Sequence, residues 1–140
     1  MKFDLGSLPK AVLDELTEYR LATLATTRAD GTTHLVPVGF TYEPATGTAR
    51  VITSVTSVKV RNIERAETER RPSRASICQV AGPGWLTLEG DIRVSRDPDE
   101  IAEAVRRYAR RYRQPRPNPR RVALIMQVDS IMGRTIPTQQ

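Results

Sequence analysis

The sequence predicts a mainly β, α+β fold, in which a six-stranded antiparallel barrel-like sheet has helices at its surface. Short segments rich in β-branched residues are separated by turn signals such as Asp30-Gly31 and 81–84, which indicates hairpins. Two other segments, 1–20 and 97–113, have helical periodicity. The 140 residues contain no internal repeat or long linker, so we expect a single domain over 1–140.

The barrel strands are expected within 21–95, followed by a last strand at 121–129 and a tail at 130–140. Six segments have the composition of strands: 21–27, 33–42, 49–53, 75–80, 85–95 and 121–129. Pro37 has no N–H for a strand ladder, so it should lie at an edge or at a break in pairing. Gly90 should mark a bulge or a sharp bend.

The first predicted helix, 1–20, has Ser7 as its expected cap and Pro9 in its first turn. Its apolar positions are expected to cover the sheet; they are Leu8, Val12, Leu13, Leu16 and Tyr19. Residues 58–66 also have helical character, whereas the charged segment 67–74 is typical of a solvated loop.

The helix predicted at 97–113 has Asp97 as its cap, Pro98 at its first position and Glu100 placed to complete a capping box. One apolar stripe runs along it and includes Tyr108 and Tyr112, which should therefore face the core. The other faces are basic; they carry Arg106, Arg107, Arg110, Arg111 and Arg113.

Positive charge is concentrated between Arg106 and Arg121, which contains eight arginines and no acidic residue. Subtracting these eight charges from the net charge of +6 leaves the rest of the chain at −2. A local patch of this kind suits a solvated helix face, a nucleic acid or another anionic partner. The helical phase turns both tyrosines away from the arginines, which argues against a nucleic-acid surface that stacks bases on aromatic rings.

Cys78 is the only cysteine, so the chain can form no internal disulfide and no multi-cysteine metal site. We therefore predict no metal ligands and expect a reducing, cytoplasmic location. No segment is long and apolar enough to span a bilayer, so no membrane association is expected.

Four segments carry a family resemblance: 21–42, 49–63, 79–90 and 106–122. Together they resemble the split β-barrel flavin and deazaflavin oxidoreductases related to pyridoxamine 5'-phosphate oxidase, the FMN-binding split-barrel type. Within that family the chain is most similar to the small actinobacterial branch that uses coenzyme F420 and includes biliverdin reductases.

The resemblance implies a homodimer that holds coenzyme F420 in a groove at the subunit interface. The reduced deazaflavin would transfer a hydride to a small conjugated acceptor, with the tetrapyrrole biliverdin, reduced to bilirubin, as the expected substrate. Two alternatives stay open: an oxidoreductase that binds FMN in the same groove, and a cofactor-free basic module that binds nucleic acid.

The resemblance also implies the residues that contact the cofactor, although it assigns no catalytic residue. Lys59 and Asn62 match a pattern beside the phosphate, and Gln79 and Trp85 match positions that reach the site across the dimer. The full set is His34, Leu35, Val36, Pro37, Ile52, Thr53, Ser54, Val55, Thr56, Ser57, Lys59, Asn62, Gln79 and Trp85.

Without the resemblance, each of these residues has a simpler interpretation. Lys59 is a surface lysine, the single histidine His34 is a packed strand residue, and Trp85 belongs to the core. F420 has an acidic tail and biliverdin carries two propionates, so arginine forks would suit either ligand. We expect one or more of these arginines to hold an anionic ligand: Arg106, Arg110, Arg113, Arg116, Arg120 and Arg121.

Overall fold

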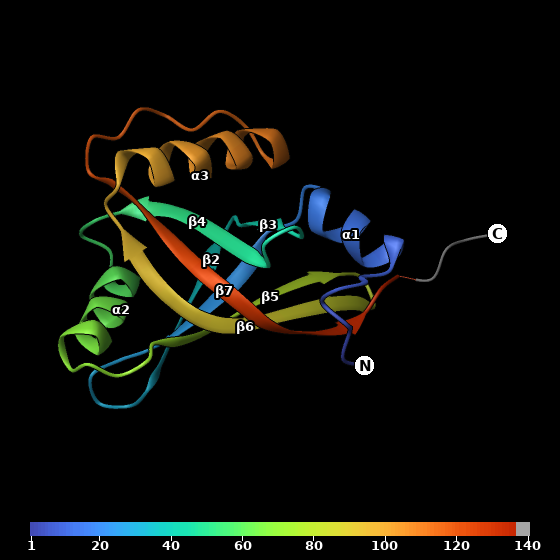
Figure 1. Cartoon of the computed structure of the whole chain (residues 1–140), viewed down its shortest axis with the longest axis horizontal. Coiled ribbons are helices and arrows are strands. Elements are labelled where there is room, and N and C mark those ends of the chain that lie inside the picture. Colours follow the sequence, from blue (N-terminus) through green and yellow to red (C-terminus); the bar gives the residue numbers. More distant parts are fainter. Residues whose placement is uncertain (137–140) are drawn as a thin grey trace.

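The computed structural model describes residues 1–136, which form a seven-stranded antiparallel sheet with three helices around it (Figure 1). The strands are β1 (Ala22–Thr27), β2 (Thr33–Val38), β3 (Thr41–Glu43), β4 (Thr48–Ser54), β5 (Arg74–Ala81), β6 (Gly84–Ser95) and β7 (Arg121–Arg134). The helices are α1 (Lys10–Thr17), α2 (Val58–Thr68) and α3 (Pro98–Arg111). The prediction of a mainly β, antiparallel fold with flanking helices is confirmed.

The strands follow the order β2-β1-β5-β6-β7-β4-β3, so β2 and β3 lie at the two edges of the sheet. These strands are consecutive in the chain and are separated only by Gly39 and Phe40. The sheet must therefore curl until its edges approach each other, although β2 and β3 do not pair. Figure 1 shows α3 across β4 and β7, with α1 and α2 near opposite ends of the sheet.

The two edges leave a gap in the barrel wall, which we call the seam. β3 pairs only with Thr48–Arg50 of β4. The remaining part of β4, Val51–Ser54, pairs with β7 on one side and has no strand partner on the other. Backbone groups along an unpaired edge are free to bind another molecule.

The strand predicted at 33–42 is divided into β2 and β3, which is why the sheet has seven strands and not six. At the break, a Cβ on Gly39 would lie 3.0 Å from the Tyr108 ring and 3.1 Å from the Tyr112 ring. The next N–H, of Phe40, donates to the Tyr112 hydroxyl at 3.1 Å. Helix α3 thus takes the place of a neighbouring strand. Pro37 lies on the edge strand β2, as predicted.

Gly90 sits at a register shift between β6 and β7, so the predicted bulge is confirmed. A Cβ at this position would overlap the backbone carbonyl of Gln127. The core lies inside the curled sheet; its fully buried side chains include Leu24, Phe40, Ile77, Leu88, Leu124 and Ile131.

Both ends of the chain differ from the prediction. Helix α1 begins at Lys10 with Pro9 at its N-cap, because Ser7 bonds to the Asp4 carboxylate and does not cap the helix. The helix ends at Thr17, and Tyr19 is 61% exposed and does not face the core. β7 continues to Arg134 because 130–134 still pair with β6, so only part of the predicted tail lies outside the strand. Residues 137–140 of that tail lie outside the described residues.

Helices α2 and α3 agree with the prediction except in two details. α2 continues to Thr68, so the solvated loop predicted from 67 begins slightly later. The Asp97 side chain accepts a hydrogen bond from the Asp99 N–H at 3.0 Å, which confirms the predicted cap. Glu100 does not complete a capping box, because its carboxylate instead binds Arg93 at 2.6 Å and Ser95 at 2.7 Å.

Arg111 was expected on an exposed face of its helix but is only 8% exposed. Its guanidinium donates to the carbonyls of Glu15 (3.3 Å), Glu18 (2.8 Å) and Phe40 (2.7 Å) and to Oε1 of Gln79 (2.8 Å). It also lies 4.7 Å from the centre of the Phe40 ring. One side chain therefore joins α3 to α1, to the link between β2 and β3, and to β5. Burial lowers the pKa of Arg111.

We predict that Arg111→Met destabilises the protein by about 3–5 kcal/mol, because it leaves buried acceptors without a donor. Urea unfolding at neutral pH in sodium chloride, without phosphate or carboxylate buffer, measures this change. Arg110→Met is the matched control, since Arg110 is exposed and should change stability by no more than about 0.5 kcal/mol. Equal effects of the two variants would contradict the role assigned to Arg111.

Candidate functional site

A cleft of about 380 Å³ lies at the seam, and we call it the seam cleft. It gathers parts of β2, β4, α2, α3 and the loop before β7. Its lining residues are Pro37, Val38, Gly39, Ile52, Thr53, Ser54, Lys59, Tyr108, Pro115, Asn118 and Arg121. No Asp or Glu is among them.

Two walls of the seam cleft follow from the split in the barrel. One wall is the end of β2 and Gly39, against which the Tyr108 ring can pack closely only because glycine has no side chain. The other wall is Ile52–Ser54, on the part of β4 that has an unpaired edge. The cleft thus combines a flat aromatic ring with a strand edge, which are suitable contacts for a planar ligand.

The proline-rich loop after α3 closes one side of the cleft. Asn118 donates from Nδ2 to the Ser54 hydroxyl at 2.9 Å and accepts at Oδ1 from the Arg120 N–H at 2.9 Å. The Arg120 carbonyl in turn accepts from the Val55 N–H at 2.8 Å. These bonds hold the loop against the end of β4 and bring Arg121 to the cleft.

Lys59 is the second residue of α2, and it lines the cleft without an ion-pair or hydrogen-bond partner within residues 1–136. Burial of its half-buried side chain lowers its pKa. Ser57, at the N-cap, makes no side-chain capping bond, so its hydroxyl leaves the N–H groups of the first turn open within residues 1–136. A cation beside the open N-terminus of a helix is a suitable site for a phosphate group.

Arg121 is the second cation in the cleft. Its guanidinium donates to the Arg116 carbonyl at 2.6 Å and forms no ion pair with a described carboxylate. Lys59 and Arg121 therefore face a cleft without neutralising acidic groups. This electrostatic field favours an anionic ligand.

The structure brings together five of the predicted cofactor residues: Pro37, Ile52, Thr53, Ser54 and Lys59 all line the seam cleft. Three others lie nearby in sequence but do not line it. Val55 is half-buried and packs against the core, Thr56 is exposed, and Ser57 occupies the N-cap position of α2 without a capping bond.

The other predicted residues lie outside the seam cleft. Asn62 is buried between α2 and β1, where it donates to the Thr26 hydroxyl at 3.0 Å. His34 is half-buried opposite Thr26, and its Nδ1 is buried without a partner in the described structure. On the same strand, Leu35 points outward and Val36 packs against the core.

Gln79 and Trp85 lie far from Lys59 in the fold and share a small crevice near α1. Gln79 is buried, and its amide donates to the Glu15 carbonyl at 2.9 Å while accepting from Arg111. Its contacts are thus structural within this chain. Trp85 is half-buried, opposite Val80 of the neighbouring strand.

The outer face of β2, β1, β5 and the start of β6 is largely uncharged, although Arg134 of β7 lies beside Trp85 and Glu89 lies further along β6 on the same face. Strand alternation places one set of residues on this face: Leu21, Thr23, Ala25, Leu35, Pro37, Ser76, Cys78, Val80, Trp85 and Thr87. Leu21 is 59% exposed, and Leu35 and Val80 are each 64% exposed. An exposed apolar patch of this kind marks an interaction surface.

Sequence reasoning missed Val38, Gly39, Tyr108, Pro115 and Asn118 as cleft residues. Helical periodicity placed Tyr108 on the core-facing stripe, and its ring does pack against Tyr112 at 4.9 Å. The same ring also lines the cleft, because α3 crosses the open seam and not a closed sheet. The signal that could have revealed this was the Gly39 break inside an otherwise continuous strand pattern.

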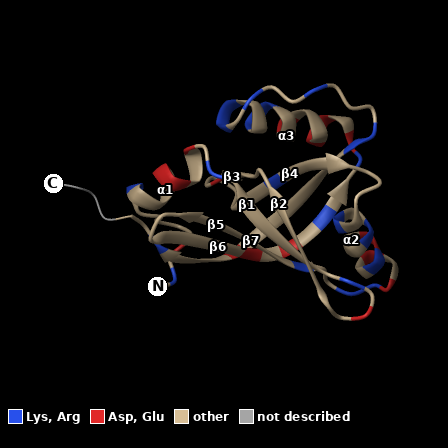
Figure 2. Ribbon diagram, turned by 180° about the vertical axis from the view of Figure 1, so that it is seen from behind, with Lys and Arg blue, Asp and Glu red and all other residues tan. Residues whose placement is uncertain are grey.

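The arginines of 106–121 have different environments. Arg106 and Arg107 form ion pairs with Glu103, and Arg107 also pairs with Glu43 at 2.9 Å. Arg111 is in the core, and Arg121 is the only member that lines the seam cleft. Figure 2 shows the basic residues at the end of α3 and along the following loop.

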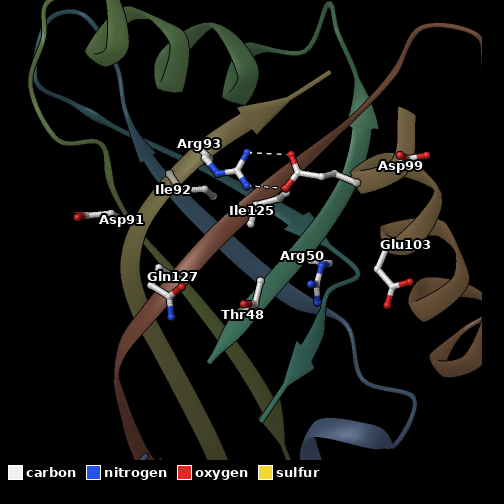
Figure 3. A pocket seen from close by; sticks show the side chains of 10 residues that line it. Thr48, Arg50, Asp91, Ile92, Arg93, Asp99, Glu103, Ile125 and Gln127 are labelled. Carbon is white, nitrogen blue, oxygen red and sulfur yellow. Dashed lines mark hydrogen bonds and ion pairs between the residues drawn. The ribbon is translucent and has the colours of Figure 1, made fainter. Parts of the chain in front are cut away.

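A larger cleft of about 490 Å³ lies between α3 and the outer face of β4, β7 and β6 (Figure 3). Its lining has four carboxylates and two arginines, so it carries a net negative charge. Arg93 pairs with Glu100 at 2.6 Å, and Arg50 pairs with Glu43 at 3.1 Å. None of the predicted cofactor residues lines this cleft, so the seam cleft is the better candidate site.

Comparison with known protein families shows to which family this chain belongs. A family model described as pyridoxamine 5'-phosphate oxidase matches residues 8–133. The chain belongs to the pyridoxamine 5'-phosphate oxidase family. Another member is an F420H(2)-dependent biliverdin reductase from Mycobacterium tuberculosis, 47% identical over 118 residues, which cover 84% of this chain and 82% of that protein.

Solved structures show the same fold for other proteins of low sequence identity. A conserved hypothetical protein from Mycobacterium tuberculosis has a TM-score of 0.73 at 19% identity, covering 96% of this chain and 92% of that one. An F420 reductase has a TM-score of 0.68 at 20% identity, covering 89% and 98%. Within residues 1–136, no helix has the length and apolar character needed to cross a membrane.

We predict that Lys59→Met raises the Tm of the ligand-free protein at pH 7 by about 2–4 °C, because it removes a half-buried charge without a partner. Burial lowers the pKa of Lys59 below its ordinary value of 10.5. Between these two pKa values the unfolded chain binds more protons, so the stability of the wild type rises with pH. The advantage of the variant should therefore shrink as pH rises toward 10.5.

Thermal unfolding at pH 7 and pH 10 measures this difference. Lys10→Met is the control, because Lys10 is exposed and its variant should stay near the wild type at pH 7. An advantage of Lys59→Met that grows with pH would contradict the assignment of a buried, unpaired ammonium.

Proposed function

We propose that this protein is an F420-dependent reductase that transfers a hydride from the reduced deazaflavin to a small conjugated acceptor. The observation that carries the proposal is the seam cleft, where Lys59 and Arg121 face a planar-ligand site without acidic groups. A family relative at 47% identity is an F420H(2)-dependent reductase, which supports the choice of cofactor.

The residues present fit a cofactor with a ring and a phosphate. Lys59 and the open N–H groups at the start of α2 would hold the phosphate, because both carry positive charge without a partner within residues 1–136. The unpaired edge of β4 would contact the ring system, with Tyr108 as a flat wall. When bound, the deazaflavin supplies the hydride, and the protein supplies position and electrostatics.

The chain's own contribution to the reaction is therefore orientation. Asn118 fixes the Ser54 hydroxyl at 2.9 Å, and Gly39 fixes the position of Tyr108, so both walls are held by the fold. No Asp or Glu lines the cleft, so the proton that completes the reduction would come from solvent or from a cleft group that carries a proton, such as Arg121 or Lys59.

Biliverdin is the acceptor that we propose, on the basis of the named activity of one relative. Its two propionates would require cations, and Arg120 and Arg121 line a further basic cleft of about 610 Å³ that shares Asn118 and Arg121 with the seam cleft. Because the two clefts adjoin, an elongated anionic ligand can extend from one to the other.

We also propose that the protein acts as a homodimer through the largely uncharged outer face of β2, β1, β5 and the start of β6. Pro37 belongs both to this face and to the seam cleft, so a second copy would cover the site. In that arrangement Trp85, which lies far from Lys59 in one chain, could approach the partner's site.

Titration with F420, followed by deazaflavin fluorescence, tests the cofactor. We expect saturable binding, and a loss of affinity of about 10- to 100-fold in Lys59→Met, because one charge-assisted phosphate contact is removed. Lys10→Met is the control and should bind like the wild type. A parallel titration with FMN tests the alternative cofactor, since a phosphate site would also accept FMN.

Mixing the protein with F420H2 and biliverdin tests the acceptor, because turnover restores the visible absorbance of oxidised F420. Binding of F420 without turnover would exclude biliverdin as the acceptor and leave F420 as the cofactor. Failure to bind F420, together with tight binding of FMN, would identify FMN as the cofactor. Failure to bind either would refute the proposed reductase.

For the dimer, we expect sedimentation velocity to show a two-fold increase in mass over the monomer. Val80→Asp should shift the protein to monomer and weaken F420 binding, because it places a charge beside Trp85 on the apolar face. Thr56→Asp, exposed near the cleft but outside this face, should stay dimeric. A monomeric wild type would contradict the proposal.

A further inference from the structure

A separate cavity of about 180 Å³ lies at the junction of α1, β3 and α3. It is lined by Leu16, Thr17, Thr41, Tyr42, Arg107, Arg110 and Arg111. The lining contains three arginines and no carboxylate. It shares no residue with the seam cleft, so it is independent of the proposed cofactor site.

A buried hydroxyl without a partner lies in the wall of this cavity. Thr41 is 7% exposed, and its Oγ1 has no hydrogen-bond partner within residues 1–136. Alternation along β3 puts Thr41 on the same face as Glu43, whose carboxylate binds Arg107 of α3 at 2.9 Å. The Thr41 hydroxyl therefore points toward α3. Burying a hydroxyl without a partner costs free energy, which a ligand could recover.

The positive charge around the cavity is only partly neutralised. Arg107 is paired with Glu43 and Glu103. Arg111 is buried, yet all of its hydrogen-bond acceptors are neutral, and neither it nor Arg110 forms an ion pair in the described part of the chain. A buried guanidinium without an anion is electrostatically unfavourable.

Backbone carbonyl groups near the C-terminal end of α1 would repel an anion in this cavity. Those of Glu15 and Glu18 accept hydrogen bonds from Arg111, which reduces this repulsion. Burial lowers the pKa of Arg111, and the nearby Glu15 carboxylate, which would raise it, does not offset this effect.

We propose that this cavity binds a small oxyanion, with the Thr41 hydroxyl and the Arg110 guanidinium as its direct donors and the charge of Arg111 behind them. A volume of 180 Å³ equals that of about six water molecules, which suits a phosphate or a carboxylate group. It is smaller than the clefts of about 300–1,000 Å³ that hold cofactors. The bound anion would stabilise the α1–α3 junction.

Thermal unfolding in sodium phosphate, sodium acetate and sodium chloride of equal ionic strength tests the proposal. The experiment uses the Lys59→Met background, so that phosphate bound in the seam cleft does not contribute. We expect phosphate, acetate or both to raise the Tm by about 3–6 °C over chloride at saturation. Phosphate alone identifies a phosphate site, and a larger effect of acetate identifies a carboxylate site.

Two further substitutions in that background identify the donors. Arg110→Gln should abolish the anion-dependent rise, whereas Arg106→Gln, on the same helix but outside the cavity, should retain it. Thr41→Val keeps the shape of the side chain and removes the hydroxyl. It should raise the Tm in chloride by about 2–4 °C and lose the anion-dependent rise.

Three outcomes would overturn the proposal. The first is no difference among the three salts in the Lys59→Met background. The second is an anion-dependent rise that survives both Arg110→Gln and Thr41→Val. The third is a lower Tm of Thr41→Val in chloride, which would show that the hydroxyl is satisfied by water.

Discussion

Side chains at the end of α3 and directly after it hold the link between β2 and β3, which is not held by strand pairing. The candidate site depends on these contacts. The Phe40 carbonyl accepts from Arg111 at 2.7 Å and from the Tyr112 hydroxyl at 3.0 Å, and the Phe40 N–H donates to the same hydroxyl. Backbone groups that could have extended a strand are thereby used. The two edges of the sheet stay apart, and the seam remains open for a ligand.

The electrostatics of the molecule follow from where each cation finds a partner. Arg107 forms ion pairs with two carboxylates, whereas Arg111 donates its hydrogen bonds to neutral acceptors. Lys59 and Arg121 have no acidic partner among the described residues and face the same cleft. A net charge of +6 thus says little about where an anion binds, because the free energy of anion binding depends on which cations are unpaired and partly shielded from water.

Much of the fold was predictable from local patterns. Strand alternation, the Asp97 cap and the Gly90 bulge depend on residues close together in sequence, and all three were confirmed. The division of the strand 33–42 was not predictable, because it depends on Tyr112, which is 72 positions from Phe40. Arg111 was misplaced for the same reason, since its acceptors lie on three other segments.

For the candidate site, the sequence indicated the segments that contribute to the seam cleft, namely the end of β2, the end of β4 and the start of α2, through its resemblance to a family of cofactor-binding proteins. Residue type and spacing by themselves gave only the strands and the helix on which these segments lie. Only the tertiary structure decided that Tyr108 and Asn118 join them, while Asn62 and Gln79 are buried by other contacts. The physical reason is that a cleft is the space left by packing, and packing depends on contacts between residues distant in sequence.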